Sequence, residues 1–184
     1  ARGRPAKAET LCRFELQHLE AKLGAEHPNT LAAVNNLASL LEGQGQRGEA
    51  EKCYCRALQG LEAALGAQHP ETLAAMYRLA ALLEGCGASR RGEAEVLYRR
   101  ALGGYEAVLG AEHPDTLGTL FQLACLVEAC GRLNDAESLF RRELAGCEAL
   151  HGPTHPHTRG SRRSLARVLR AAGKVEEAVE LERR

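Results

Sequence analysis

Apolar residues recur at helical spacing along this chain, in paired segments that glycines separate. Between Pro28 and about Gly43 one apolar stripe repeats every three or four residues, and a second stripe follows between about Glu49 and Leu65. The first stripe consists of Leu31, Val34, Leu37, Ala38 and Leu41, and the second of Ala50, Tyr54, Ala57, Leu58, Leu61 and Leu65. Glycine accepts the backbone conformation that ends helices, and it follows both stripes. The pattern predicts two helices joined by a tight turn.

This helix pair repeats along the chain behind a block of the form L-G-x-x-H-P-x-T-L. The block spans residues 23–31, 65–73 and 109–117, and a degenerate copy spans 151–159. Its His-Pro pairs begin at residues 27, 69, 113 and 155, so the spacings are 42, 44 and 42. Self-similarity at this period is typical of a solenoid, whose units bury their apolar faces against their neighbours. The two extra residues fall within 87–91, between two helices.

The spacing divides the chain into a single array, for which we expect no β structure. We expect a half repeat at 8–24, full repeats at 25–66, 67–110 and 111–152, and a partial repeat at 153–184. The half repeat is one helix, from Glu9 to Leu23, and the partial repeat has a helix over about 157–172 and a short one from Val175. Because there is no initiator Met, we expect the chain to be a segment of a longer protein.

The repeat unit resembles the tetratricopeptide repeat, in the 42-residue variety of kinesin light chains. The resembling residues are Asn35-Asn36-Leu37-Ala38-Ser39-Leu40-Leu41, then Gly45, then Glu49-Ala50-Glu51-Lys52-Cys53-Tyr54-Cys55-Arg56-Ala57-Leu58 and the His-Pro link. The resemblance extends from about Ala8 to Leu181. It implies an all-α fold, a right-handed superhelical α-solenoid of helix-turn-helix repeats.

The same resemblance implies that the first helix of each repeat lines a concave groove that binds a partner. Equivalent positions along the array give the candidate partner-binding residues Asn35, Asn36, Ser39, Tyr77, Arg78, Phe121, Gln122 and Arg163. In kinesin light chain relatives an asparagine at this level commonly holds the backbone of an extended peptide, but only the first full repeat keeps Asn35-Asn36. Tyr77 and Phe121 either frame an apolar pocket or pack into the core between repeats.

The last first-type helix carries a basic stripe formed by Arg159, Arg163, Arg167 and Arg170, with Arg162 beside it. Like charges at this helical spacing repel. Two interpretations remain open: the stripe binds an anionic partner, in which Arg163, Arg167 and Arg170 are the candidate contacts, or it belongs to a solvated or capped terminal helix whose missing neighbour supplies acids such as glutamate.

Composition narrows the classes of function. Lysine plus arginine and aspartate plus glutamate number 24 each, which argues against nucleic-acid binding, and no apolar run approaches the length of a membrane span. Seven scattered cysteines without a C-x-x-C motif indicate reduced thiols. The repeated histidines are interpreted as loop residues, since neighbouring repeats are too far apart for shared metal ligation. No catalytic motif is present, so no enzyme activity, cofactor or metal is expected.

These observations favour a non-catalytic scaffold or adaptor that binds a protein or peptide with acidic and apolar residues. One alternative is a structural subunit that is permanently buried in a large complex. A less favoured alternative is the regulatory module of an enzyme whose catalytic domain lies outside this segment. The cysteines favour the cytoplasm, or an organelle interior if a transit peptide has been removed.

Overall fold

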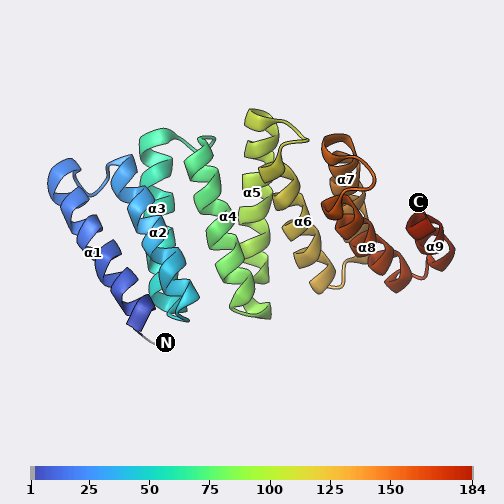
Figure 1. Cartoon of the computed structure of the whole chain (residues 1–184), viewed down its shortest axis with the longest axis horizontal. Helices are drawn as coiled ribbons and strands as arrows, with labels where there is room; N and C mark the ends of the chain where they lie inside the picture. The colour runs from blue at the N-terminus through green and yellow to red at the C-terminus, as the bar shows by residue number, and fades with distance from the viewer. Residues whose placement is uncertain (1–2, 184) are drawn as a thin grey trace. The chain divides into compact units, whose positions relative to one another are not determined.

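The computed structural model describes the backbone of residues 3–183 and the side chains of residues 8–183, and this part of the chain is helical without any strand. The elements in order are α1 (Gly3–Leu23), α2 (Pro28–Gly43), α3 (Arg47–Leu65), α4 (Pro70–Gly85), a 3-10 turn η1 (Ala88–Arg90), α5 (Arg91–Leu109), α6 (Pro114–Ala129), α7 (Leu133–His151), α8 (Pro156–Ala171) and α9 (Val175–Arg183) (Figure 1). The all-α prediction is therefore confirmed for these residues.

The breaks between helices fall where the glycine pattern places them, and the starts of some helices differ. α1 begins at Gly3 rather than Glu9, α3 begins at Arg47 rather than Glu49, and α8 begins at Pro156. Differences of one or two residues at helix ends are usual, whereas α1 begins six residues before its predicted start. The two extra residues of the second repeat are accommodated at η1.

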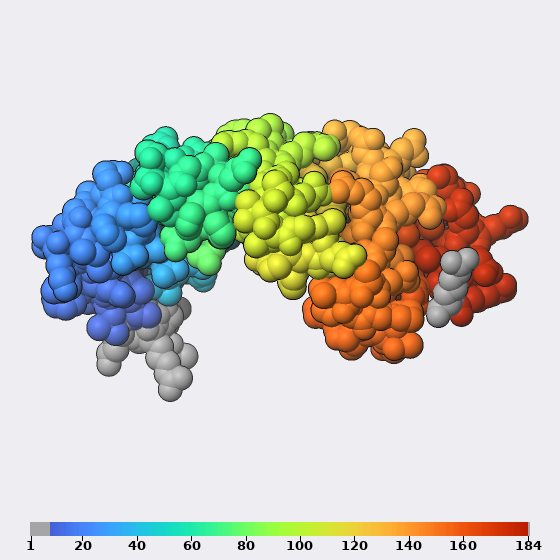
Figure 2. Space-filling view, turned by 90° about the horizontal axis from the view of Figure 1, so that it is seen from above, coloured from blue at the N-terminus to red at the C-terminus, as the bar shows by residue number. Residues whose placement is uncertain are grey.

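The chain divides into two compact units, Ala1–Gly104 and Tyr105–Arg184. In the first unit α1 contacts α2, α2 contacts α3, α3 contacts α4, and the first-type helices α2 and α4 also touch. In the second unit α6, α7, α8 and α9 contact one another in chain order. The colours of neighbouring atoms accordingly follow the sequence within each unit in the space-filling view (Figure 2). Each helix thus packs mainly on its sequence neighbours, as a solenoid requires.

The recurring histidines cap the first helix of every repeat. The imidazole Nδ1 of His27, His69, His113 and His155 accepts a hydrogen bond from the backbone N–H two residues later, at 3.2–3.3 Å. Each histidine has an extended backbone and precedes the proline at the helix start, where the missing N–H costs nothing. The prediction that each histidine organises its own loop is confirmed.

The glycine and the threonine of the block close the same loop. Gly24, Gly110 and Gly152 have positive φ angles of 94°, 91° and 82°, which side chains strongly disfavour. The carbonyl oxygen of each accepts a hydrogen bond from the threonine hydroxyl six residues later, at 2.8 Å in all three cases. The loop therefore sets the angle at which each first helix leaves the preceding second helix.

The final leucine of the block fills a notch on the second helix of its own repeat. Leu31 lies against Gly60, Leu73 against Gly104 and Leu117 against Gly146. A Cβ added to these glycines would lie 2.6, 2.3 and 2.3 Å from the nearest leucine methyl. Only glycine therefore allows the two helices of a repeat to approach this closely.

An ion pair joins successive second-type helices at equivalent positions. Arg56 binds Glu20 at 2.7 Å and Arg100 binds Glu62 at 2.5 Å in the first unit, and Arg142 binds Glu106 in the second unit. We call these pairs the Arg–Glu rungs. The rungs link helices that are neighbours in the stack but not in the sequence.

Candidate functional site

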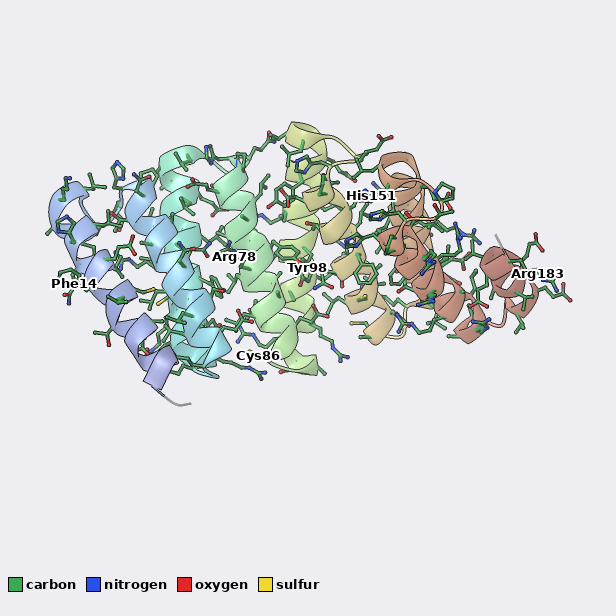
Figure 3. The ribbon with its side chains drawn as sticks, in the orientation of Figure 1. Phe14, Arg78, Cys86, Tyr98, His151 and Arg183 are labelled. Atoms are coloured by element: carbon green, nitrogen blue, oxygen red, sulfur yellow. The ribbon has the colours of Figure 1, made fainter. Side chains whose placement is uncertain are left out.

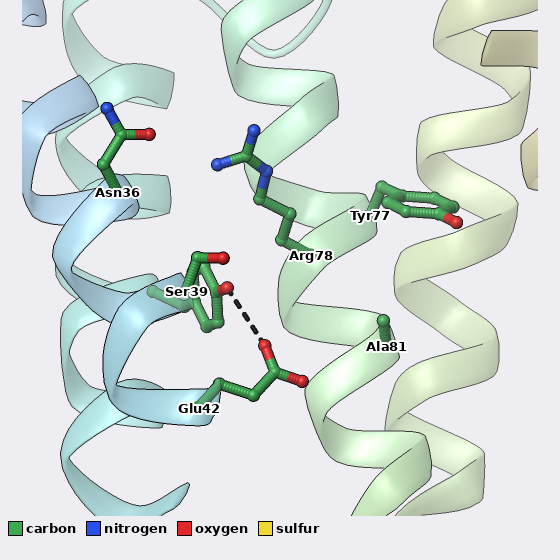
Figure 4. A pocket seen from close by; sticks show the side chains of 7 residues that line it. Asn36, Ser39, Glu42, Tyr77, Arg78 and Ala81 are labelled. Carbon is green, nitrogen blue, oxygen red and sulfur yellow. Dashed lines mark hydrogen bonds between the residues drawn. The ribbon is translucent and has the colours of Figure 1, made fainter. Parts of the chain in front are cut away.

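A hollow of about 390 Å³ opens between the first-type helices α2 and α4 of the first unit (Figure 4). We call it the α2–α4 hollow. Its lining residues are Asn36, Ser39, Glu42, Tyr54, Tyr77, Arg78 and Ala81. Four of the sequence-predicted partner-binding residues, Asn36, Ser39, Tyr77 and Arg78, therefore lie together.

Two polar side chains in this hollow have no partner within the described part of the chain. Arg78 projects from α4 towards α2, is half-buried, and forms neither an ion pair nor a hydrogen bond there (Figures 3 and 4). Asn36 is exposed on α2 and forms no side-chain hydrogen bond within the same residues. An amide and a guanidinium are thus available to a ligand.

Asn35 has a different environment from its neighbour. Its side chain is buried, with 7% exposed, and its Oδ1 has no hydrogen-bond partner among the described residues. A buried carbonyl without a donor costs about 1–3 kcal/mol. A donor from outside the described chain would relieve that cost.

The wall of the hollow contains a hydrogen bond that the sequence interpretation missed. The buried Tyr54 donates its hydroxyl to Glu42 at 3.1 Å, and Tyr98 donates to Glu84 at 3.2 Å in the next repeat. Burial, together with the Glu42 charge, raises the pKa of Tyr54 to about 12, so the phenol stays protonated. Tyr54 was predicted only as a core residue. Glutamate recurs near the ends of α2 and α4, as Glu42 and Glu84, and this recurrence is the signal that the tyrosine hydroxyl has an acceptor.

The two groove aromatics each pack on the second helix of their own repeat. Tyr77 meets Tyr98 edge-on with ring centroids 5.6 Å apart, and Phe121 meets Phe140 edge-on at 5.6 Å. Both rings remain half-buried. Tyr77 and Phe121 belong to different compact units, so a pocket framed by both stays a prediction. Gln122 lies beside Phe121 on α6 and is half-buried.

The arginines of α8 do not form one uniform stripe. Arg167 binds Glu128 at 2.9 Å and Arg170 binds Glu182 at 2.5 Å, whereas Arg163 is exposed and forms no hydrogen bond to a described residue. In the two preceding repeats a tyrosine hydroxyl donates a hydrogen bond to the equivalent glutamate. Phe140 takes the place of that tyrosine and has no hydroxyl, so Glu128 can pair with Arg167 instead. Neighbouring acids therefore offset part of the stripe.

A buried polar cluster joins α7 and α8 in the second unit. Glu143 Oε1 accepts hydrogen bonds from Ser161 at 2.7 Å and from Cys147 at 3.1 Å, while Oε2 has no partner among the described residues. Burial raises the pKa of the Glu143 carboxyl, and burial with the adjacent carboxyl raises the pKa of Cys147 to about 11. The thiol is thus protonated and a poor nucleophile.

The imidazole rings of three nearby histidines stack on one another. His151 and His155 have centroids 4.5 Å apart, and His157 lies within 5.8 Å of both. Among the described residues no group of three His, Cys, Asp or Glu side chains is arranged to hold a metal ion. Within the same part of the chain, every helix is too short or too polar to cross a bilayer.

Comparison with known families finds the tetratricopeptide repeat. One model of this family matches residues 1–63, 32–91 and 126–184, and a second model matches residues 72–115. A search of curated proteins finds no match.

Solved structures with the same fold cover nearly the whole chain. BtubC (BKLC) from P. vanneervenii is 21% identical with a TM-score of 0.88, over 97% of this chain and 70% of that one. A Podosopora anserina protein described as a kinesin light chain with nearly identical TPR-like repeats is 27% identical, with a TM-score of 0.85 over 97% and 84%. A Rap protein, solved in complex with Competence and Sporulation Factor, is 15% identical with a TM-score of 0.66 over 98% and 49%. The predicted fold class and the resemblance to kinesin light chain repeats are confirmed.

Proposed function

Since the chain belongs to the tetratricopeptide repeat family, a family of protein-interaction scaffolds, we propose that its α2–α4 hollow binds an extended segment of a partner protein. The observation that carries this proposal is the set of unpartnered polar groups in and beside one hollow. Buried polar groups are normally hydrogen-bonded, so the orphan Oδ1 of Asn35 beside a concave site favours a ligand, and Asn36 and Arg78 offer further polar groups there.

The chemistry of these groups defines the segment. Asn35 and Asn36 offer amides that match the N–H and C=O groups of an extended backbone. Arg78 carries an unpaired guanidinium, which forks onto a carboxylate. Tyr77 also lines the hollow and its ring is half-buried, and aromatic residues are common anchors at interfaces. We therefore propose a partner segment with an acidic residue next to an apolar one.

In this proposal the protein binds its partner and catalyses no reaction. Two described residues whose pKa is raised to about 12 and about 11 are held by their own neighbours: Tyr54 by Glu42 and Cys147 by Glu143. Neither arrangement pairs an activated nucleophile with a base. In the first unit Ser39 belongs to the proposed binding surface. In the second unit Phe121, Gln122, Arg167 and Arg170 stay candidate contacts on the first-type helices α6 and α8.

Site-specific photo-crosslinking of the full-length protein tests the proposal. A benzophenone amino acid replaces Ser39 in the hollow, and in a matched control it replaces Gln59, which is exposed on the second-type helix α3. We expect the partner to cross-link from position 39 and not from position 59. Equal cross-linking from both positions would instead favour burial of the chain in a large complex.

Arg78→Glu provides the quantitative test with the partner that position 39 captures. Reversing a desolvated charge contact should weaken binding by at least about 2 kcal/mol, measured by titration calorimetry. Circular dichroism verifies that the variant is folded, because the new carboxylate lies near Glu42. Lys52→Glu, at an exposed site on α3, is the control for net charge. Unchanged affinity in a folded Arg78→Glu variant would remove this hollow from the interface.

A further inference from the structure

The helices α6, α7 and α8 repeat α2, α3 and α4, so a position in one unit can be compared with its equivalent in the other. The His-Pro pairs that precede α2 and α6 begin at residues 27 and 113, which gives an offset of 86 residues. By this offset Glu128 is the equivalent of Glu42, and Arg167 is the equivalent of Ala81. The second unit therefore pairs this glutamate with an arginine at a position where the first unit has only a methyl group.

The Arg167–Glu128 pair shows how a guanidinium reaches this glutamate. The ion pair joins Arg167 Nη2 to Glu128 Oε2 at 2.9 Å, with 58% of the arginine side chain exposed and 16% of the glutamate side chain exposed. The arginine thus lies on the open side of a mostly covered carboxylate. A basic side chain that belongs to another protein could approach the equivalent glutamate of the first unit in the same way, since Ala81 leaves that place open.

Glu42 is held in place and keeps one oxygen for a ligand. Its Oε2 accepts the hydroxyl of the buried Tyr54 at 3.1 Å, which fixes the orientation of the carboxylate. Its side chain forms no ion pair within the described part of the chain. Glu42 is half-buried and lines the α2–α4 hollow together with Ala81 (Figure 4). The remaining oxygen is therefore a fixed acceptor inside the proposed binding site.

The arginine of the same hollow does not neutralise Glu42. Arg78 forms no ion pair with a described residue, and its guanidinium lies on the Asn36 side of Ser39, whereas the Glu42 carboxylate lies on the other side (Figure 4). Opposite charges thus remain unpaired at two places in one hollow. A segment that brought only an acidic residue to Arg78 would add a second carboxylate near Glu42, and like charges at an interface disfavour a partner. A basic residue in the segment removes this conflict.

We infer that the α2–α4 hollow also binds a basic side chain of the partner segment, and that Glu42 is the residue that selects it. The carboxylate oxygen that Tyr54 leaves free accepts an N–H of an arginine or a lysine, at the place that Arg167 takes in the second unit. The inference rests on the proposed binding of an extended segment in this hollow and adds to it. The segment then carries a basic residue for Glu42 besides the acidic residue for Arg78 and the apolar one.

Selection from a phage-displayed library of random peptides tests the inference on the full-length protein. Wild type and Glu42→Gln are used as separate baits, and glutamine still offers Tyr54 an acceptor, so the hollow should keep its structure. We expect wild type to enrich arginine or lysine in addition to acidic and apolar residues, and Glu42→Gln to lose the preference for the basic residue. A peptide selected on wild type should bind Glu42→Gln at least about tenfold more weakly, because a charge-assisted hydrogen bond is lost. The control is Glu15→Gln, at an exposed site on α1, which should leave the affinity unchanged.

Ala81→Arg copies the ion pair of the second unit into the first. Arginine is a good helix former, so α4 should persist, and circular dichroism verifies this. The new guanidinium should bind Glu42 as Arg167 binds Glu128, and the affinity for the selected peptide should fall at least about tenfold because the place of its basic residue is taken. Side-chain nuclear magnetic resonance of the new Nε–Hε group reports the pair directly, since its signal should shift when Glu42→Gln is added.

Several results would overturn the inference. Wild-type peptides with acidic and apolar residues but no enriched basic residue would refute the role of Glu42 and still support the binding of a segment. Equal affinity of a selected peptide for wild type and Glu42→Gln would place its basic residue elsewhere. An Nε–Hε signal in Ala81→Arg that ignores Glu42→Gln would show that the hollow does not hold a guanidinium there. Selection that yields no peptide sensitive to Arg78→Glu or Glu42→Gln would remove the hollow from binding, and the proposed function would then fail together with the inference.

Discussion

The leucine–glycine notch can be tested with two adjacent glycines of α5. A Cβ at Gly104 would lie 2.3 Å from Leu73 Cδ2, 3.0 Å from Cδ1 and 3.2 Å from Cγ, whereas a Cβ at Gly103 meets nothing within 4 Å. Leu73 is only 1% exposed. Because three of its atoms are too close, rotating one methyl group does not relieve the clash. Gly104→Ala should therefore strain the interior, and Gly103→Ala should not.

The expected magnitudes follow from two opposing effects. Alanine is favoured over glycine in a helix interior by about 0.8–1.0 kcal/mol, and Gly103→Ala should gain roughly this amount. Overpacking a buried site by a methyl group costs about 1–3 kcal/mol, which opposes that gain at Gly104. The free energies of unfolding of the two variants should then differ by about 1–3 kcal/mol, with Gly104→Ala the less stable.

Urea denaturation followed by circular dichroism measures both variants and a double-mutant cycle. Leu73→Ala removes the side chain that occupies the notch and costs about 2–5 kcal/mol by itself. In that background Gly104→Ala should change sign and become stabilising, because helix propensity acts without the clash. If Gly104→Ala stabilises the wild-type background as much as Gly103→Ala does, the notch does not require glycine.

Two further predictions concern a helix cap and a buried acid. His113→Ala should lower the free energy of unfolding by about 1 kcal/mol and His113→Asn by less, since asparagine supplies a capping oxygen; equal urea midpoints would contradict the capping role. Because burial raises the folded-state pKa of Glu143, its stabilising contribution is full below the unfolded pKa and is lost as the pH rises through the folded pKa. Glu143→Gln should therefore gain stability relative to wild type as the pH rises above the unfolded glutamate pKa of about 4.3, and a pH-independent difference in urea denaturation would contradict this.

The helical pairs were predictable because their signals are local. The glycines, the His-Pro pairs and the apolar stripes fix each turn within a few residues, and only the polar first turns of α1 and α3 were missed. The notch was not predicted, since a glycine inside a stripe does not reveal which side chain lies against it. The two partners lie on different helices of one repeat, Leu31 on α2 and Gly60 on α3.

The candidate site was predictable only in part. Equivalent positions placed Asn36, Ser39 and Arg78 in one hollow, because neighbouring repeats bring the same helix face side by side. The state of Arg167 could not be predicted, since it depends on Phe140, whose lack of a hydroxyl leaves Glu128 to pair with the arginine. A change of residue type at equivalent positions of the repeats is visible in the sequence. Its effect on an ion pair such as Arg167–Glu128 depends on contacts among three helices.

The Arg–Glu rungs have a consequence for how the length of such an array changes in evolution. Each rung uses the same two residue types at equivalent positions of successive second-type helices. Duplication or deletion of one whole repeat in the gene would therefore join an arginine and a glutamate that already match. A change of any other length would misalign the pair and leave a charge without its counterpart. The rungs thus make the whole repeat the natural unit of insertion and loss.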